Sequence, residues 1–427
     1  MENQICVATT KCRICGSTFL QSVLNLGEQY IASIFVDKDT PLSLLHPFPL
    51  EIVRCEGKTG CGLVQLKHTI SPDVLYTRYG YRSGTNEIMR ANLRDIVQNI
   101  ERMIDLKDGD TILDIGCNDG TLLESYNNKK LDRLGIDPAD NIIKGAIEKG
   151  LEIIDNYFSY EVFSTVRPHK KARVITSIAM FYDLEDPQKF VRDIKESLTD
   201  DGIWVIELSY LPFMLKKNSF DTICHEHLEY YSLRQMEWMF EKVGFYVQKV
   251  ELNDVNGGSF RLYIRNIGHG KSTKIDQENI DKIRAEEKGM KLDSDATYQS
   301  FRKSVSSIKE DLKKIINDII NNDKKIYIYG ASTKGNTILQ YCNINNQITP
   351  KAADRNPDKW GKFTLGTDIP IISEQQARDE KPDYFLVLPW HFLDGFLKRE
   401  KEFLKRGGKF IIPLPEVRII GINDLHL

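Results

Sequence analysis

Residues 111–123 read Thr-Ile-Leu-Asp-Ile-Gly-Cys-Asn-Asp-Gly-Thr-Leu-Leu. This stretch predicts an apolar strand, a turn that holds Gly116 and Gly120, and the start of a helix. Glycines at such a turn let a ligand approach the backbone where side chains would block it. The next apolar strand ends at Asp137, whose carboxylate would accept hydrogen bonds from ribose hydroxyls. The turn and the acidic residue together predict an α/β domain that binds a ribose-containing ligand.

The spacing within the turn favours one class of ligand. A dinucleotide site needs the pattern G-x-G-x-x-G, whereas this turn has Asp-x-Gly-x-x-x-Gly. An acidic residue at the strand end suits a ligand with a zwitterionic amino-acid end, such as S-adenosylmethionine (SAM), better than a diphosphate. We therefore predict a methyltransferase site, with a generic α/β turn as the alternative. The expected cofactor-binding residues are Asp114, Gly116, Asn118, Gly120, Asp137, Asp155 and Met180. The aromatic residues that follow Met180 are also compatible with an ordinary core.

Strands and helices alternate outward from this stretch. Further strands are expected at 133–136, 172–177, 203–208, 245–252 and 259–265, with helical patterns between the first four strands of the series. This order predicts a mainly parallel sheet that helices cover on both faces. The last two strands follow each other across a turn and predict a closing antiparallel hairpin.

The chain is too long for one ordinary core, with 427 residues. Residues 1–75 predict a small, loop-rich module, and 76–266 the methyltransferase domain. Residues 267–322 predict a helical connector, and 323–427 a second, Rossmann-like α/β domain with strands at 325–330, 383–389 and 409–412. Apolar residues of the connector recur at spacings of three and four, which predicts one buried helix face. They are Tyr298, Phe301, Val305, Ile308, Leu312, Ile315 and Ile319.

Composition excludes several classes of protein. The chain has 58 Lys and Arg against 61 Asp and Glu, a formal net charge of −3, so no overall field would hold nucleic acid or an anionic membrane. No apolar run is long enough to span a bilayer, and the N-terminus lacks the pattern of a secretory signal. We therefore expect a cytoplasmic protein without nucleic-acid or membrane partners.

Four of the eight cysteines form two pairs near the N-terminus. Cys12 and Cys15 are separated by two residues, and Cys55 and Cys61 by five. Four thiolates complete a tetrahedral Zn²⁺ site and leave no position open for catalysis, so we expect structural zinc. Buried or unpaired thiols are the alternative. Eight cysteines are also few for a disulfide-bonded chain of this length, which favours a reducing compartment.

Residues 220–232 hold the densest concentration of titratable groups, including His225, Glu226 and His227. The segment follows a strand, which places it near the carboxyl edge of the sheet, where α/β domains bind ligands. Imidazole titrates near neutral pH and an adjacent carboxylate can orient it, so we predict general acid–base catalysis here. A metal site would need a third ligand that is not obvious. A polar loop whose histidines cap backbone groups is the alternative.

Several segments together resemble one family of enzymes. They are the four-cysteine front, Leu113-Asp-Ile-Gly-Cys-Asn-Asp-Gly120, His225-Glu-His227, Tyr329-Gly-Ala-Ser-Thr-Lys-Gly-Asn336 and Asp354-Arg-Asn-Pro-Asp-Lys359. Essentially the whole chain resembles the nucleotide-sugar C-methyltransferases of the deoxysugar C-3-methyltransferase type. The resemblance implies a zinc-binding domain, a class I methyltransferase domain and a C-terminal Rossmann-like domain. It also implies an NDP-4-keto-6-deoxyhexose substrate, held between the last two domains, deprotonated at C3 and methylated there.

The resemblance implies roles for single residues as well. The family's base is the second histidine of a Tyr-His-Glu-His motif, which is His227 here, with Glu226 beside it and His225 before it. Cys224 stands in place of the motif's tyrosine and is expected to contact the substrate. The negative charge of the enolate would then be stabilised by one of two other tyrosines, Tyr79 or Tyr81.

Tyr79 and Tyr81 belong to a tyrosine-rich segment that would cover the active site, and packing between modules is their alternative role. Arg82, in the same segment, would offer its charge to a phosphate or to the sugar. In the last domain, a glycine-flanked turn at 330–335 leads into a helix, so backbone N–H groups and Lys334 suit a diphosphate. The alternative for Lys334 is a solvated surface lysine, and the alternative for His391 is a core histidine with its hydrogen bonds made within the protein. Other residues expected to bind the substrate are Asn256, Asn336, Trp390 and His391.

The sequence therefore predicts SAM-dependent C-methylation at C3 of a nucleotide-linked 4-keto-deoxysugar, by a monomer or a small homo-oligomer. One alternative is an O- or N-methyltransferase that acts on a sugar or another small metabolite with the same histidine as base. Another is a zinc-ribbon protein that binds nucleic acid and carries a degenerate enzyme domain. The near-neutral charge and the intact cofactor turn disfavour the second alternative.

Overall fold

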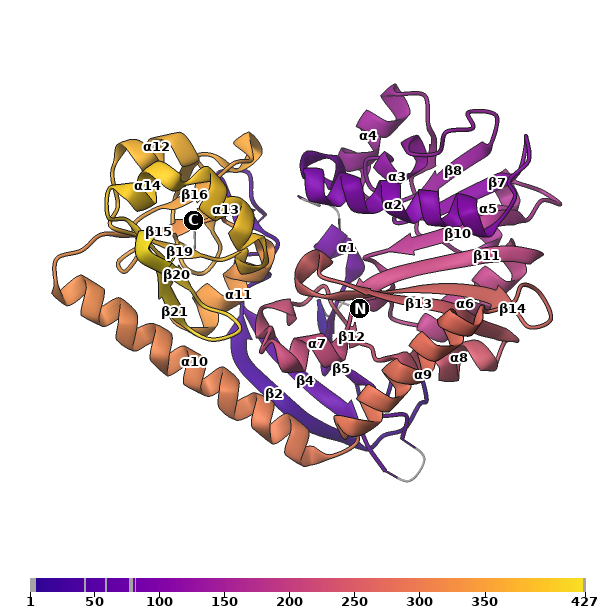
Figure 1. Cartoon of the computed structure of the whole chain (residues 1–427), viewed down its shortest axis with the longest axis horizontal. Coiled ribbons are helices and arrows are strands. Elements are labelled where there is room, and N and C mark those ends of the chain that lie inside the picture. Colours follow the sequence, from indigo (N-terminus) through magenta and orange to yellow (C-terminus); the bar gives the residue numbers. More distant parts are fainter. Residues whose placement is uncertain (1–4, 42–43, 58–59, 77–79, 81, 425–427) are drawn as a thin grey trace.

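The computed structural model describes the chain except for residues 1–4, 42–43, 58–59, 77–79, 81 and 425–427 (Figure 1). The described residues form a seven-stranded central sheet, a six-stranded C-terminal sheet and a four-stranded N-terminal sheet, besides two pairs of short strands. In Figure 1 the two larger sheets lie on either side of the molecule, and the N-terminal strands lie below and between them.

The central sheet has the strand order β9-β8-β7-β10-β11-β14-β13. Its first five strands are parallel, and β14 is antiparallel to both β11 and β13. The mainly parallel sheet and its closing antiparallel hairpin are thus confirmed, and only the short strand β9 was missed. The strands are β7 (Thr111–Ile115), β8 (Asp132–Ile136), β9 (Glu152–Ile154), β10 (Ala172–Ile178), β11 (Leu198–Ser209), β13 (Phe245–Asn253) and β14 (Ser259–Asn266).

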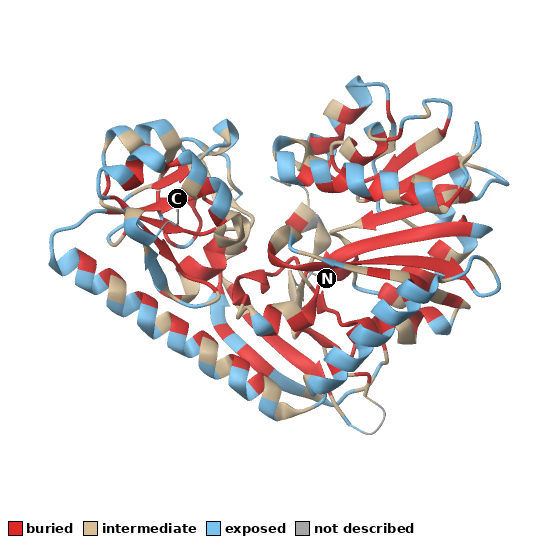
Figure 2. Ribbon diagram, viewed as in Figure 1, coloured by how far each residue is buried: buried red, intermediate tan, exposed pale blue. Residues whose placement is uncertain are grey.

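Helices cover both faces of this sheet, so most residues of its central strands are buried (Figure 2). Successive residues of a strand face opposite sides. Ile112 of β7 accordingly packs in one apolar cluster with Ile96 of α2, and Leu113 packs in another with Ile194 of α6. The helices are α2 (Glu87–Met103), α3 (Thr121–Glu124), α4 (Asp140–Glu148), α5 (Tyr160–Val166), α6 (Pro187–Ser197), α7 (Leu211–Lys216) and α8 (Leu233–Glu241).

The N-terminal sheet is antiparallel, in the order β12-β5-β4-β2. Three of its strands come from the first part of the chain, where the sequence predicted mainly loops, but β12 (Glu229–Tyr230) comes from the histidine-rich segment. The other elements here are β1 (Cys6–Ala8), β2 (Leu20–Gln29), β4 (Phe48–Cys55), β5 (Val64–Leu66), β6 (His68–Ile70) and α1 (Pro72–Tyr76). The N-terminal module is therefore joined to the histidine-rich segment through backbone hydrogen bonds.

The C-terminal sheet has the order β18-β16-β15-β19-β20-β21, which is the Rossmann order, with an antiparallel last strand. The sequence predicted β15, β19 and β20 and missed the other three strands, which are three residues long. The elements are β15 (Ile326–Tyr329), α11 (Thr333–Tyr341), β16 (Ala352–Asp354), β18 (Ile371–Ser373), α12 (Glu374–Asp379), β19 (Tyr384–Val387), α13 (Leu393–Arg399), α14 (Lys401–Lys405), β20 (Lys409–Ile412) and β21 (Arg418–Ile420).

Two helices connect the larger sheets, α9 (Lys274–Gly289) and the long α10 (Asp295–Asn321). The predicted apolar stripe of α10 is buried, except that Ile316 rather than Ile315 is in the buried set. Arg302 of α10 donates to the carbonyl oxygens of Ser22 and Val23 in β2. The helix therefore lies along the N-terminal sheet, as Figure 1 shows.

One apolar cluster joins the N-terminal sheet, α10 and the C-terminal sheet. It contains Leu50 of β4, Ile308 of α10, Ile338 of α11 and Ile411 of β20. The strands β3 (Phe35–Val36) and β17 (Phe363–Thr364) also pair, which links the N-terminal and C-terminal parts. In the described part of the chain, no helix has the length and apolar character that crossing a membrane requires.

Candidate active site

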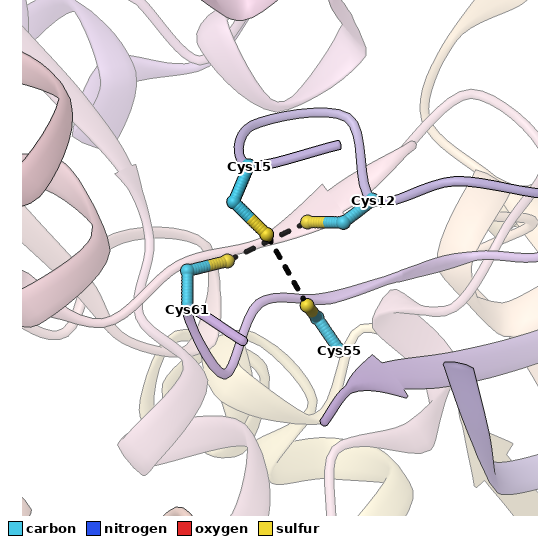
Figure 3. Close-up of side chains that lie close together, drawn as sticks. All are labelled: Cys12, Cys15, Cys55 and Cys61. Atoms are coloured by element: carbon cyan, nitrogen blue, oxygen red, sulfur yellow. Dashed lines mark hydrogen bonds between the residues drawn. The ribbon is translucent and has the colours of Figure 1, made fainter. Parts of the chain in front are cut away.

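Four thiols converge from two loops of the N-terminal module (Figure 3). Their sulfur atoms lie within 4.8 Å of one another, with 3.5 Å between Cys12 and Cys61 and 3.4 Å between Cys15 and Cys55. Zn–S bonds of about 2.3 Å place the sulfurs of a tetrahedral site about 3.8 Å apart. The arrangement therefore fits one zinc ion, with Cys55 at the end of β4 and Cys61 three residues before the start of β5.

The turn after β7 has the shape that its glycines allow. Gly116 and Gly120 have φ of 70° and 74°, in the left-handed region that favours glycine. A Cβ atom at Gly116 would lie 3.0 Å from Cγ of Met180, and one at Gly120 would lie 2.4 Å from Cδ1 of Leu151. The Met180 side chain therefore packs directly against the backbone of Gly116, and neither position has room for a larger residue.

Two buried carboxyl groups border the turn. Asp137 accepts hydrogen bonds from the backbone N–H groups of Asn118, at 2.8 Å, and Ala139, at 2.9 Å. Asp114 accepts one from the hydroxyl of Thr176 in β10, at 2.5 Å. Burial raises the pKa of both carboxyl groups, that of Asp114 to about 7. Asp137 is thus held by the turn itself, while Asp114 links the two central strands.

Asp155 follows β9 and is exposed, but its charge is near enough to raise the pKa of Asp137 further, after burial. All seven residues expected to bind the cofactor therefore lie at the carboxyl ends of β7 to β10 or in the turns that follow them. This is the edge where α/β sheets bind their ligands.

His227 lies where the central sheet meets the C-terminal part. Its Nδ1 lies 2.8 Å from the carbonyl oxygen of Thr222. Because a carbonyl can only accept, Nδ1 carries the proton of the neutral ring and Nε2 keeps its lone pair. The ring centroid is 4.3 Å from that of Tyr182. Burial, followed by the charge of Lys334, lowers the pKa of His227 to about 4. The imidazole is therefore neutral at pH 7 and suited to accept a proton at Nε2.

His225 points toward the N-terminal sheet instead. Its Nε2 lies 3.3 Å from the carbonyl oxygen of Phe48, and burial lowers its pKa. Residues 225 and 226 form a turn, so His225 and His227 do not share a face as alternate residues of a strand would. The structure thus favours the alternative in which His225 caps a backbone group, and its catalytic role stays a prediction.

Glu226 is buried at the same turn, with 4% of its surface exposed. Neither carboxylate oxygen has a hydrogen-bond partner among the described residues. Buried polar atoms without partners are uncommon in folded proteins and often mark places where a ligand or water completes the structure. Glu226 also contributes, after burial, to the raised pKa of Asp183. Its oxygens are therefore suited to accept hydrogen bonds from a ligand's hydroxyl groups.

Cys224 is 1% exposed, and its thiol donates to the carbonyl oxygen of Thr222 over 3.8 Å. Burial raises the pKa of the thiol well above its usual value, so the group is neutral. The same carbonyl receives His227 and, at 3.5 Å, the hydroxyl of Tyr230. Cys224 therefore helps to hold the backbone beneath His227, and its contact with a substrate stays a prediction.

Residues from the two larger sheets meet beside His227. Lys334, at the start of α11, donates to the carbonyl oxygen of Asn256 over 2.7 Å. Trp390 donates its indole N–H to Asp221 over 3.0 Å, and the other oxygen of Asp221 has no partner among the described residues. Burial and then Lys334 lower the pKa of His391 to about 3. Four expected substrate residues, Asn256, Lys334, Trp390 and His391, are thus brought together.

Other expected substrate residues lie elsewhere. Arg82 donates to the carbonyl oxygen of Asn141 at the start of α4, over 3.2 Å, and so lies on the cofactor side. Asn336 is 1% exposed and donates to the carbonyl oxygen of Ala32 over 2.7 Å, which ties α11 to the N-terminal module. Tyr79 and Tyr81 lie outside the described residues.

Known proteins resemble the chain along its whole length. Family models match residues 12–76 as a zinc binding domain, 86–250 as a methyltransferase domain and 254–415 as a C-methyltransferase C-terminal domain. C-methyltransferase NovU of Streptomyces niveus is 31% identical over 415 residues, which cover 97% of each chain. The chain belongs to the C-methyltransferase family. Its α/β fold, its N-terminal zinc module and its SAM-dependent C-methyl transfer follow from this membership.

Two solved methyltransferase structures align with less than half of this C-methyltransferase. The plantazolicin methyltransferase BpumL in complex with SAH is 15% identical, with a TM-score of 0.34, over 41% of this chain and 82% of its own. The mitomycin 7-O-methyltransferase MmcR is also 15% identical, with a TM-score of 0.33, over 43% of this chain and 55% of its own.

The residues present fit both cofactors of the C-methyltransferase. SAM supplies a methyl group on a positively charged sulfur, and the glycine turn after β7 and the carboxylate of Asp137 would hold it. The zinc ion is structural, because four cysteine ligands leave no open position. All seven residues that were expected to bind SAM lie at the carboxyl edge of the central sheet.

Two residues of this C-methyltransferase make contacts at the site that the sequence did not predict. Tyr182, one of the aromatic residues that follow Met180, contacts His227 and lines a small cavity with Asn256 and with residues at the ends of β10 and β11, such as Ser209. Asp221 belongs to the titratable segment, yet only the structure shows its contact with Trp390. The acidic residue in a histidine-rich segment was the available signal for Asp221.

Proposed function

We propose that this C-methyltransferase methylates C3 of an NDP-4-keto-6-deoxyhexose through an enolate. The observation that carries the proposal is His227, a buried neutral imidazole whose Nε2 is left to accept a proton. Methylation of carbon needs such a base, because a C–H bond must first lose its proton. The resemblance of the chain's motifs to the deoxysugar C-3-methyltransferases supports the choice of substrate.

The chemistry follows from the acidity of a carbon next to a ketone. The C3–H bond breaks, its proton goes to Nε2 of His227, and the electron pair moves onto the C4 oxygen. C3 then bonds to the methyl group as the sulfur–methyl bond breaks, which restores the ketone and leaves S-adenosylhomocysteine. Tyr79 or Tyr81 stays a predicted donor to the C4 oxygen. Among the described residues, Tyr182 contacts the His227 ring and the charge of Lys334 lowers its pKa. Both are therefore candidate donors to the C4 oxygen.

The nucleotide part is proposed to bind at the turn before α11. Gly330 there has φ of 82°, and the side chain of Ser332 caps the helix by accepting from the N–H of Gly335. N–H groups at the start of a helix, together with Lys334, suit a diphosphate. Because Lys334 also contacts Asn256 of the central domain, a diphosphate at this turn would place the sugar toward His227.

Loss of deuterium from C3 of the sugar tests the reaction. Incubation of the enzyme with a C3-deuterated dTDP-, CDP- or GDP-4-keto-6-deoxysugar and S-adenosylhomocysteine should exchange the deuterium for solvent hydrogen. Mass spectrometry follows the exchange, and the same panel with SAM should give a product in which a methyl group has replaced the hydrogen isotope at C3. Methyl transfer to oxygen or nitrogen without exchange at C3 would contradict the proposal.

The pH dependence of the reaction tests His227 as the base. Its pKa of about 4 means that the neutral form persists in acid and is lost only as the pH falls through about 4. The neighbouring groups are Lys334, whose charge lowers the pKa, and Glu226, whose charge raises it. We expect kcat/KM to be nearly constant from pH 8 to 5.5, where a base of pKa 6.5 would have lost about 90% of its activity. A decline centred near pH 6.5, in protein shown by circular dichroism to stay folded, would contradict this.

A further inference from the structure

Arg13 lies between the first two zinc-binding cysteines, yet its side chain is buried, with 4% exposed. Its guanidinium donates to the carbonyl oxygen of Leu66 in β5 and to the hydroxyl of Thr69 in β6, both over 2.7 Å. Its Nε lies 3.5 Å from a carboxylate oxygen of Glu229 in β12. One side chain therefore connects the zinc loop with strands of the module and with the segment that holds His227.

The buried side chain of Glu229 relies on its ion pair with Arg13. Its side chain is fully buried, and neither carboxylate oxygen has a hydrogen-bond partner among the described residues. Burial raises the pKa of Glu229 well above its usual value and the charge of Arg13 lowers it, so the charged form of this side chain depends on Arg13. The ion pair with Arg13 therefore opposes any movement of β12 away from the zinc loop.

Backbone contacts extend the connection toward the base. Glu229 pairs with Gln65 in the register of β12 and β5, and the N–H of Leu66 donates to the carbonyl oxygen of Leu228 over 2.8 Å. The side chain of Gln65 in turn accepts from the N–H of Arg13 and donates to the carbonyl of Lys11. His227 precedes Leu228 directly, so its backbone is fixed by contacts with the zinc module.

We propose that Arg13 is a positioning residue for methyl transfer, because its ion pair with Glu229 holds the segment that presents His227. The inference rests on the proposed role of His227 as the base. In this proposal the zinc module fixes the position of the active-site segment through Arg13. A displacement of a catalytic group by about 1 Å lowers rates by about 100-fold.

The test compares Arg13→Gln, Glu229→Gln and the double variant in the full-length, zinc-loaded enzyme. Each single variant is expected to lower kcat by about 10- to 100-fold, with KM and the SAM dissociation constant within about twofold of wild type. The double variant should lose no more than the worse single variant, because the two residues act through one contact. Zinc content, measured by mass spectrometry, should stay at one ion per chain.

Arg167→Gln is the matched control. Arg167 makes short ion pairs with Asp132 and Glu152, and 12% of its side chain is exposed, but it lies in the central domain outside the zinc module and the base's segment. It should lower stability without the selective loss of kcat. Unchanged kcat in the Arg13 and Glu229 variants, additive losses in the double variant, or a parallel loss of SAM affinity would each overturn the inference.

Arg13→Lys keeps the charge and serves if the glutamine variants fail to fold. Its kcat should lie between those of Arg13→Gln and wild type, because lysine keeps the charge opposite Glu229 but cannot make all the guanidinium's hydrogen bonds to Leu66 and Thr69. Wild-type kcat in Arg13→Lys would then overturn the inference. The rate of C3 deuterium exchange separates the two proposals. If wild type exchanges and the Arg13 variants exchange equally fast, the positioning role fails, whereas no exchange in wild type contradicts the proposed function.

Discussion

Replacement of His227 by asparagine or alanine is expected to lower methyl transfer by about 10²- to 10⁴-fold, the usual contribution of a general base. Asparagine is the sharper variant, because its amide N–H can still donate to the Thr222 carbonyl that Nδ1 now contacts. It therefore removes the proton acceptor at Nε2 and keeps the hydrogen bond beneath it. Product formation by mass spectrometry and C3 deuterium exchange should fall together.

SAM affinity separates this effect from a damaged cofactor site. Isothermal titration calorimetry should find the SAM dissociation constant of His227→Asn within about twofold of wild type. The matched variant Asp137→Ala should show the reverse, with SAM binding weakened by about 10- to 100-fold, as expected for the loss of hydrogen bonds to a charged group. Loss of SAM binding in His227→Asn would instead assign this residue to the cofactor.

Substitution of Cys12 by serine, or removal of zinc with a chelator, is expected to unfold the N-terminal module and abolish activity. Binding of structural zinc by four cysteines stabilises small domains by about 10–16 kcal/mol, which equals or exceeds the stability of an ordinary domain. The module also supplies β5, the partner of β12, and the apolar core that it shares with α10 and α11. Loss of the metal should therefore reach the active-site segment.

Calorimetry and zinc content check this prediction, with Cys6→Ser as the control. Cys6 is a free cysteine outside the four-sulfur cluster, so its replacement should leave one zinc per chain and nearly unchanged stability. Full activity in a zinc-free Cys12→Ser protein would show that the four thiols are only a buried cluster. Activity restored by added Zn²⁺ after chelation would support the structural role.

Much of the fold could be predicted because its signals are local. The run from Thr111 to Leu123 forms the strand, turn and helix that were expected, since left-handed turns and buried strands depend on residues close in sequence. Strands of three residues, such as β16 and β18, were missed, because an apolar run so short has no clear period. In α10 the buried position is Ile316 and not Ile315, a difference of one residue that depends on the exact rotation of the helix against its partner.

The site was predicted less completely. His225 and His227 look alike in sequence, but the turn at 225–226 sends one toward Phe48 and the other toward Tyr182. Asn336 follows the turn that was expected to bind a diphosphate, yet its side-chain amide donates a hydrogen bond to the carbonyl oxygen of Ala32, 304 residues earlier. Neither outcome follows from the neighbouring residues, because each depends on a partner that only the folded chain brings near.

By itself, the sequence determined the order of the α/β elements, the cofactor turn and the four zinc-binding thiols. These depend on local residue types, and for the thiols on the strong preference of one ion for four sulfurs. Only the tertiary structure decided that β12 completes the N-terminal sheet, that Lys334 contacts Asn256 and that Arg13 reaches Glu229. These contacts form between residues far apart in the chain, where burial forces each polar group to find a partner and so selects pairs that no sequence period encodes.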